Sequence, residues 1–215
     1  MIPSNLENKK KRMVVKHIEE TKSHKQFSDY ADEFEYLIHS GIALSVLAIS
    51  NPKFPLSESE QKSLLKLYLN DVGILTGILY DTNINAILDD VKSVNLGTVY
   101  ESVVAQELHA HGNTLCYYDN KKKGEVDFLI DDFGHLEVLP IEVKSGKDYK
   151  VHSALNAFIG TSDYNISRAI VLSNKREVTS ENGICYMPIY YCMFLHRSPS
   201  SEEDLYIPEI PPFQL

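Results

Sequence analysis

The chain has 215 residues, of which 43% are hydrophobic and 24% charged, with 10 Gly, 9 Pro and 3 Cys. This composition excludes a disordered, collagen-like or disulfide-stabilised small protein and is typical of one full globular domain with a smaller piece. The formal net charge of −9 disfavours sequence-independent nucleic-acid binding by the whole chain, because proteins with that activity are basic. No apolar stretch reaches the roughly 20 residues of a membrane span, and no signal segment is evident. We therefore expect a cytoplasmic protein that does not bind a membrane, with its three widely spaced cysteines reduced and buried.

The charge is unevenly distributed along the chain. Residues 1–25 contain seven Lys or Arg and three Glu, a net charge of +4, so the rest of the chain carries −13. A basic arm of this kind can bind DNA electrostatically, with a steep dependence on salt. One interpretation of the chain is therefore a winged-helix DNA-binding protein that uses its N-terminal arm.

The first fifty residues predict a small N-terminal unit. Residues 30–38 have the apolar spacing of an amphipathic helix, and Gly41 follows where a C-terminal cap is expected. The apolar run 42–49 predicts a strand. Prolines in 51–55 then interrupt regular structure, so we place a boundary there. Residues 1–50 are interpreted as a helical or winged-helix-like remnant.

A connecting segment, residues 56–95, follows this unit. Within it, residues 64–75 predict a strand that leads into a helix through the polar pair Asn70-Asp71. This strand and helix lead into the main domain.

Residues 97–111 predict a helix with a carboxylate on its apolar face. Val104, Ala105 and Leu108 follow Glu101 at i+3, i+4 and i+7, so Glu101 shares their side of the helix. A buried charge costs free energy unless it is paired or bound to a cation. Glu101 is therefore a candidate functional residue.

The rest of the chain predicts short strands and one helix, separated by polar turns. In chain order these are strands at 115–118, 125–130 and 138–144, a helix at 151–159, a buried strand at 169–173 and an extended segment at 184–195. The strand-helix-strand order implies a right-handed crossover onto a mixed sheet. We predict an α/β fold with its main domain at 96–196 and an irregular tail at 197–215.

Three acidic residues and a lysine form the pattern that indicates a catalytic site. Glu142 and Lys144 project to the same side of their predicted strand, because successive side chains alternate. Asp127 lies in the preceding strand and can approach Glu142 if the two strands pair as a hairpin. Glu101 would reach this point from the helix. Carboxylates are the ligands that Mg²⁺ or Mn²⁺ prefers, and such an ion with a nearby lysine can activate water for hydrolysis of a phosphodiester.

The two strands also carry a family resemblance. Residues 125–130 (EVDFLI) and 141–146 (IEVKSG) resemble the motifs of the PD-(D/E)XK nuclease superfamily. The resemblance places Asp127, Glu142 and Lys144 at the motif positions, with the helical acidic position at Glu101. It implies a restriction-endonuclease-like mixed sheet flanked by helices, with Glu101, Asp127 and Glu142 as Mg²⁺ ligands and Lys144 as the residue that assists hydrolysis of DNA.

A closer resemblance covers residues 60–195. Residues 67–75 (LYLNDVGIL), 97–108 (GTVYESVVAQEL) and the two strands above are similar to the C-terminal domain of unknown function in a prokaryotic family of AAA-type ATPases. Here no Gly-x-x-x-x-Gly-Lys-[Ser/Thr] motif is present, so no ATPase activity is expected from this chain. The resemblance leaves a second hypothesis open: a catalytically silent nuclease-like domain that regulates an ATPase or binds nucleic acid or a protein partner.

Several neighbouring residues have two interpretations. Residues 121–123 are three lysines that, with Lys147 and Lys150, either contact a phosphate backbone or form a solvated turn, and the solvated turn is favoured. Glu125 shares the strand face of Asp127. It either supports the site as a neighbour of the metal ligands or is a carboxylate that faces the solvent. The aromatic residues Tyr186, Tyr190, Tyr191 and Phe194 are expected in the core rather than in a base-stacking platform.

Overall fold

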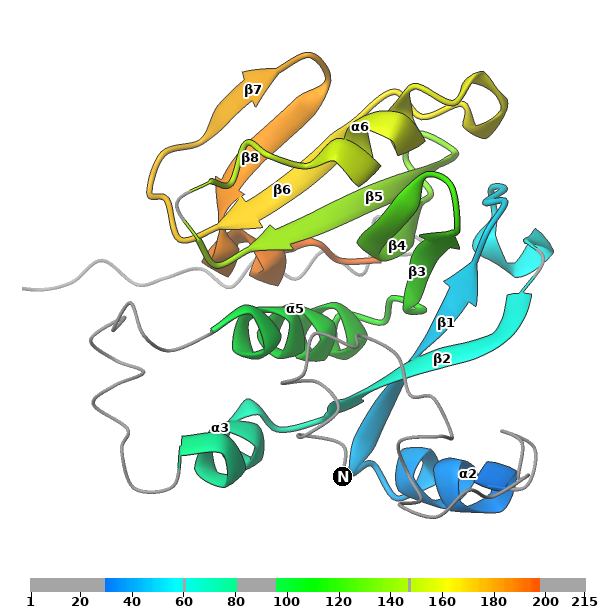
Figure 1. Cartoon of the computed structure of the whole chain (residues 1–215), viewed down its shortest axis with the longest axis vertical. Helices are drawn as coiled ribbons and strands as arrows, with labels where there is room; N and C mark the ends of the chain where they lie inside the picture. The colour runs from blue at the N-terminus through cyan, green and yellow to red at the C-terminus, as the bar shows by residue number, and fades with distance from the viewer. Residues whose placement is uncertain (1–29, 60, 81–95, 147, 198–215) are drawn as a thin grey trace, which may run out of the picture.

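The computed structural model describes residues 30–59, 61–80, 96–146 and 148–197 (Figure 1). The described helices, including the 3₁₀ helices η3 to η5, are α2 (Ala31–His39), η3 (Leu56–Glu58), α3 (Val72–Tyr80), α5 (Gly97–Ala110), α6 (Ser153–Ile159), η4 (Ser162–Tyr164) and η5 (Ile189–Phe194). The described strands are β1 (Ala43–Ile49), β2 (Gln61–Leu69), β3 (Cys116–Asn120), β4 (Gly124–Asp132), β5 (Glu137–Lys144), β6 (Ala169–Ser173), β7 (Thr179–Glu181) and β8 (Ile184–Pro188). None of the helices in these ranges is long and apolar enough to cross a membrane.

The described strands form one mixed sheet in the order β2-β1-β3-β4-β5-β6-β8-β7. Pairing is antiparallel for β1–β2, β3–β4, β4–β5 and β7–β8. It is parallel for β1–β3, β5–β6 and β6–β8, and the β5–β6 pair is joined through α6 as the predicted crossover requires. The expected α/β fold, a mixed sheet flanked by helices and preceded by a small helical segment, is confirmed.

Two helices cover opposite faces of the central strands (Figure 1). On one face, Val104 and Leu108 of α5 pack in a core cluster with Phe128 and Ile141 of the sheet. On the other face, Leu155 and Phe158 of α6 belong to a separate cluster with residues of β3, β4 and β8. Since each cluster is made of buried apolar side chains, this layering holds β4 and β5 between two hydrophobic cores.

The N-terminal elements extend the same sheet. α2 ends at His39, and Gly41, with a positive φ of 71°, follows Ser40 before the chain enters β1, as the sequence predicts. Phe34 of α2 packs on Leu65 and Leu67 of β2 in a third cluster. The predicted boundary at 51–55 thus falls between two strands that pair with each other. Residues 9–25, which carry the basic arm of the winged-helix hypothesis, lie outside the described residues.

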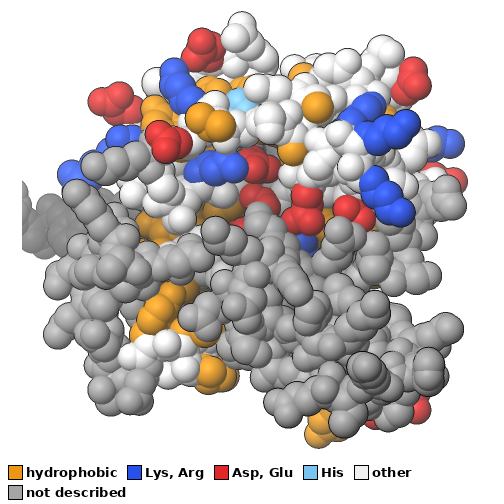
Figure 2. Space-filling model, in the orientation of Figure 1, with side chains coloured by type: hydrophobic (Ala, Val, Ile, Leu, Met, Phe, Trp, Pro, Cys, Tyr) orange, Lys and Arg blue, Asp and Glu red, His pale blue; other side chains and the backbone are white. Residues whose placement is uncertain are grey.

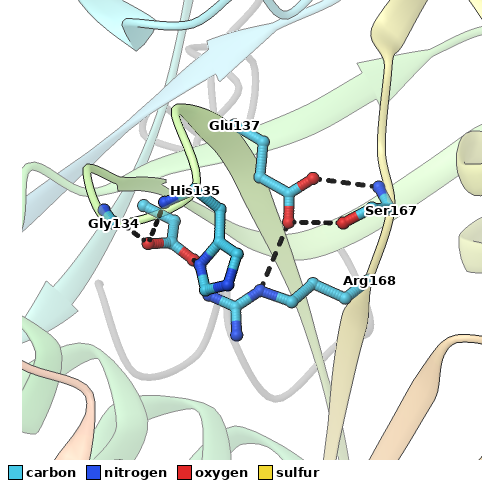
Figure 3. A network of polar contacts seen from close by, with 6 residues as sticks. Gly134, His135, Glu137, Ser167 and Arg168 are labelled. Carbon is cyan, nitrogen blue, oxygen red and sulfur yellow. Dashed lines mark hydrogen bonds and ion pairs between the residues drawn. The ribbon is translucent and has the colours of Figure 1, made fainter.

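The strands β4 and β5 form a hairpin, and polar contacts hold its turn in place (Figure 3). We call the group formed by Asp132, His135, Glu137, Ser167 and Arg168 the hairpin network. Glu137 accepts hydrogen bonds from the Ser167 backbone N–H at 3.0 Å, the Ser167 hydroxyl at 2.8 Å and Arg168 Nε at 3.2 Å. Arg168 and His135 also contact the Asp132 carboxylate. The network ties the turn to the residues that precede β6.

The segment 184–195 differs from its prediction. β8 ends at Pro188, which has no backbone N–H to continue a ladder, and the chain then forms η5 instead of a longer strand. Tyr186 is buried, as expected. Tyr190 and Phe194 are 56% and 62% exposed, so the expectation that they lie in the core is wrong. The 3₁₀ turns of η5 bury only Cys192 among its residues.

The three cysteines are free thiols. Cys116 and Cys192 are buried as predicted, whereas Cys185 is half-buried. Burial raises the pKa of Cys116 to about 12 and that of Cys192 to about 11. Both buried thiols therefore stay protonated at neutral pH and behave as small apolar side chains.

Candidate functional site

The site predicted from the sequence lies where two paired strands separate. β4 and β5 pair only as far as Phe128 and Ile141. Beyond this pair, β4 continues along β3, and β5 continues along β6. Asp127 and Glu142 are the first residues past the last pair, so both acidic residues lie at the point of divergence and do not face each other within a ladder.

A β-bulge in β4 positions Asp127. The pairing of β3 with β4 shifts register between Cys116 and Tyr118, where β4 has one residue more than β3. That extra residue falls at Asp127 and Phe128, and bulges of this kind redirect side chains. The Asp127 carboxylate is 1% exposed, and its Oδ2 accepts a hydrogen bond from the Val143 backbone N–H at 2.9 Å. Asp127 therefore bridges the gap between the separating strands.

Glu101 reaches the same region from α5. It is 7% exposed, which confirms that its carboxylate lies on the buried face of the helix. The Tyr68 hydroxyl of β2 donates a hydrogen bond to Glu101 Oε2 at 2.9 Å. Burial and the nearby carboxylates of Glu101, Asp127 and Glu125 raise the pKa of Tyr68 well above its usual value. Tyr68 is therefore a protonated donor, and Glu101 and Asp127 both act on it electrostatically.

Glu142 and Lys144 form an ion pair at the end of β5. Lys144 Nζ lies 2.7 Å from Glu142 Oε1, which agrees with the prediction that the two side chains share one side of the strand. Glu142 is buried, whereas the Lys144 side chain is 28% exposed. The lysine is thus the member of the predicted set that solvent and a ligand reach most easily.

The sequence analysis missed a buried lysine. Lys66 of β2 is fully buried, with its Nζ 2.9 Å from Glu125 Oε1 and 4.4 Å from the centroid of the Tyr117 ring. Glu125, whose side chain is 23% exposed, is thus the ion-pair partner of a buried lysine. A signal was present in the sequence, because Lys66 and Tyr68 interrupt the apolar run 64–69 and lysine is almost never buried unless it is paired.

We call the whole group the acidic centre. Its members, drawn from β2, α5, β4 and β5, are Lys66, Tyr68, Glu101, Glu125, Asp127, Glu142 and Lys144. Figure 2 shows one face of the molecule, where Asp and Glu side chains lie near the middle with Lys and Arg side chains to either side. The buried carboxylates of Glu101, Asp127 and Glu142 contribute little to any surface of the molecule. Two surface cavities, of about 410 and 390 Å³, have none of these seven residues in their walls.

The donor chemistry of the acidic centre fits a hard divalent cation. Glu101, Asp127 and Glu142 are all buried carboxylates, and carboxylate oxygens are what Mg²⁺ and Mn²⁺ prefer. In the described part of the chain, however, no three His, Cys, Asp or Glu side chains are already arranged to hold a metal. One oxygen of each carboxylate accepts a hydrogen bond from the protein. Glu101 accepts it from the Tyr68 hydroxyl, Asp127 from the Val143 backbone N–H and Glu142 from Lys144 Nζ.

The lysines with two interpretations, a phosphate contact or the favoured solvated turn, have contacts within the protein. Lys123 Nζ lies 2.7 Å from Thr161 Oγ1, beside the Tyr164 ring. Lys150 forms an exposed ion pair with Glu181 at 3.0 Å. Both sets of contacts agree with the interpretation of a surface turn. Lys147 lies outside the described residues.

Comparison with known proteins matches part of the chain to a family. Residues 96–192 match the family described as "Domain of unknown function (DUF4143)". This agrees with the predicted resemblance to a domain of unknown function. The matched segment runs from α5 to η5 and contains the four predicted site residues, whereas Lys66 and Tyr68 lie before it. Neither the curated proteins nor the solved structures contain a match to the chain.

Proposed function

We propose that the chain is a metal-dependent nuclease of the PD-(D/E)XK type that hydrolyses phosphodiester bonds in DNA. The observation that carries the proposal is the position of Asp127 and Glu142 at the divergence of β4 and β5, with Lys144 bound to Glu142. The order α5-β3-β4-β5-α6-β6 supports it, because the motif residues then come from one hairpin and the helix that covers it.

The chain's own residues have separate roles in this proposal. Glu101, Asp127 and Glu142 would hold Mg²⁺ or Mn²⁺, which supplies a bound water of lowered pKa and a positive charge beside the phosphate. Lys144 presents a partly exposed ammonium group at the same point. A fixed positive charge there orients the attacking water and stabilises negative charge that develops on the phosphate.

A second function is favoured by a different observation. Carboxylates of the acidic centre already accept bonds from protein donors, and no group of metal ligands is assembled among the described residues. This arrangement is also that of a catalytically silent domain, which would regulate an AAA-type ATPase or bind DNA or a protein partner. The two proposals differ in metal binding, since the silent domain requires no saturable site.

Cleavage of a panel of nucleic acids tests the proposal. Linear, branched and single-stranded DNA, and RNA, are incubated with the protein and Mg²⁺ or Mn²⁺. We expect cleavage of DNA by the unsubstituted protein and none by Asp127→Ala. Asp132→Asn is the matched control, because it alters a carboxylate at the other end of β4 and should leave cleavage intact. Equal cleavage by Asp127→Ala would contradict the assignment, and silence across the panel would favour the partner-binding domain.

A further inference from the structure

The strand β2 contributes two buried polar side chains to the acidic centre. Lys66 and Tyr68 are two residues apart, so they project from the same face of the strand. Lys66 reaches Glu125 and Tyr68 reaches Glu101, at 2.9 Å in each case. Both residues lie before the segment 96–192 that matches the family of unknown function. A strand outside the matched segment therefore touches two of the four carboxylates.

The Tyr68 hydroxyl is held in a fixed direction. The side chain is fully buried, and its ring packs against Phe128 with centroids 5.9 Å apart. Phe128 follows Asp127 in the bulge of β4, so the same ring contact links β2 to the strand that carries a second carboxylate. A buried ring with this contact leaves the hydroxyl little freedom to turn away from Glu101.

The hydroxyl is also the right kind of group to orient a carboxylate. A phenol hydroxyl is an O–H donor, and here it donates to Glu101 Oε2 at 2.9 Å. Hydrogen bonds from neighbouring groups to metal-binding carboxylates fix the direction of the oxygen atoms, and their loss weakens metal binding by about 10–100-fold.

We propose that Tyr68 is a positioning residue of the acidic centre, whose hydroxyl orients the Glu101 carboxylate for a divalent cation. The inference rests on the metal-dependent function proposed above. It assigns β2 to the functional unit, so the site consists of residues from four elements rather than from the matched segment alone.

Calorimetric titration with MnCl₂ tests this role on the full chain. Tyr68→Phe removes the hydroxyl and keeps the ring against Phe128, and we expect its Mn²⁺ Kd to rise about tenfold. Tyr118→Phe is the matched control, because Tyr118 is equally buried but bonds to Tyr164 in the core on the other face of the sheet. Its Kd should not change. A purely structural role would lower the melting temperature of Tyr68→Phe without changing its Kd.

The outcomes separate this inference from the proposed function. Binding by the unsubstituted protein with an unchanged Kd in Tyr68→Phe overturns the role of Tyr68 and leaves the nuclease proposal standing. Absence of Mn²⁺ binding in the unsubstituted protein overturns both.

A second measurement covers the case in which Tyr68→Phe does not fold. 3-Fluorotyrosine incorporated site-specifically at position 68 keeps both ring and hydroxyl, and we expect its ¹⁹F signal to shift on saturation with Mg²⁺. The same label at position 118 should not respond. A position-68 signal that is unchanged by bound Mg²⁺ contradicts the inference.

Discussion

The two ends of the β4–β5 hairpin hold carboxylates in different ways. In the hairpin network, Glu137 receives three donors, one of them cationic, where β4 and β5 are still paired (Figure 3). In the acidic centre, Glu142 and Glu125 have lysine partners, Lys144 and Lys66. Glu101 and Asp127, by contrast, accept hydrogen bonds from neutral donors, the Tyr68 hydroxyl and the Val143 N–H, beside the point where the strands separate. The first arrangement neutralises a carboxylate and closes a turn. The second has carboxylates from α5, β4 and β5 beside the point of strand separation, and this is the region to which the proposed function assigns a cation.

Replacing Lys144 tests the proposed catalytic role of the acidic centre and has the largest expected effect. If Lys144 orients water and stabilises the phosphate, Lys144→Ala should lower the rate of DNA cleavage at least about 100-fold. Mn²⁺ binding should persist, because the three carboxylates remain. Initial rates over a range of substrate concentrations show whether kcat rather than KM falls. A normal kcat in this variant is incompatible with the assigned role.

Replacing Glu137 tests the structural role of the hairpin network. Glu137→Ala removes the acceptor for Ser167 and Arg168 and should lower the free energy of unfolding by about 2–3 kcal/mol, as expected for a buried, charge-assisted group. Mn²⁺ affinity should stay within twofold of the unsubstituted protein. Urea unfolding measures the first quantity and calorimetry the second. A large loss of metal affinity would mean that the two ends of the hairpin are not independent.

Replacing Lys66 sharpens the comparison at the acidic centre. Lys66→Met removes a fully buried ammonium group and leaves Glu125, which is 23% exposed, without that ion-pair partner. We expect a loss of about 1–2 kcal/mol in the free energy of unfolding, less than for a fully buried pair because water reaches Glu125. The double variant Lys66→Met/Glu125→Gln should recover most of the loss. Additive losses in the double variant would show that the pair does not interact.

The smallest effect is expected for His135 in the hairpin network. Its ring lies 3.0 Å from Asp132, but the side chain is 59% exposed, so solvent screens the pair. His135→Ala should change the free energy of unfolding by less than about 0.5 kcal/mol in urea unfolding at pH 6. A change above about 1 kcal/mol would show that His135 contributes more to the free energy of unfolding than an exposed ion pair usually does.

Much of the fold follows from local sequence patterns. Apolar runs and polar turns predict β3 to β6 closely, and the helical spacing around Glu101 places its carboxylate on a buried face. The bulge at Asp127 has no such signal, because register depends on which strand lies alongside. The contact of Tyr68 with Glu101 joins residues 33 positions apart, so it depends on how β2 packs against α5.

The exposed part of η5 was missed for a related reason. Tyr190 and Phe194 are aromatic and lie in an apolar run, a pattern that favours burial. Whether such a run is buried depends on which of its residues face the sheet. The turn after Pro188 directs Cys192 inward and leaves Tyr190 and Phe194 exposed.

Calorimetric titration of the full chain with Mn²⁺, beside Glu142→Ala, tests the central claim most directly. A metal-dependent acidic centre predicts a saturable binding signal at millimolar Mn²⁺ or below, and this signal should be lost in Glu142→Ala while Glu137→Gln retains it. No saturable signal in the unsubstituted protein, or an equal signal in Glu142→Ala, would contradict the assignment of the acidic centre as a cation site.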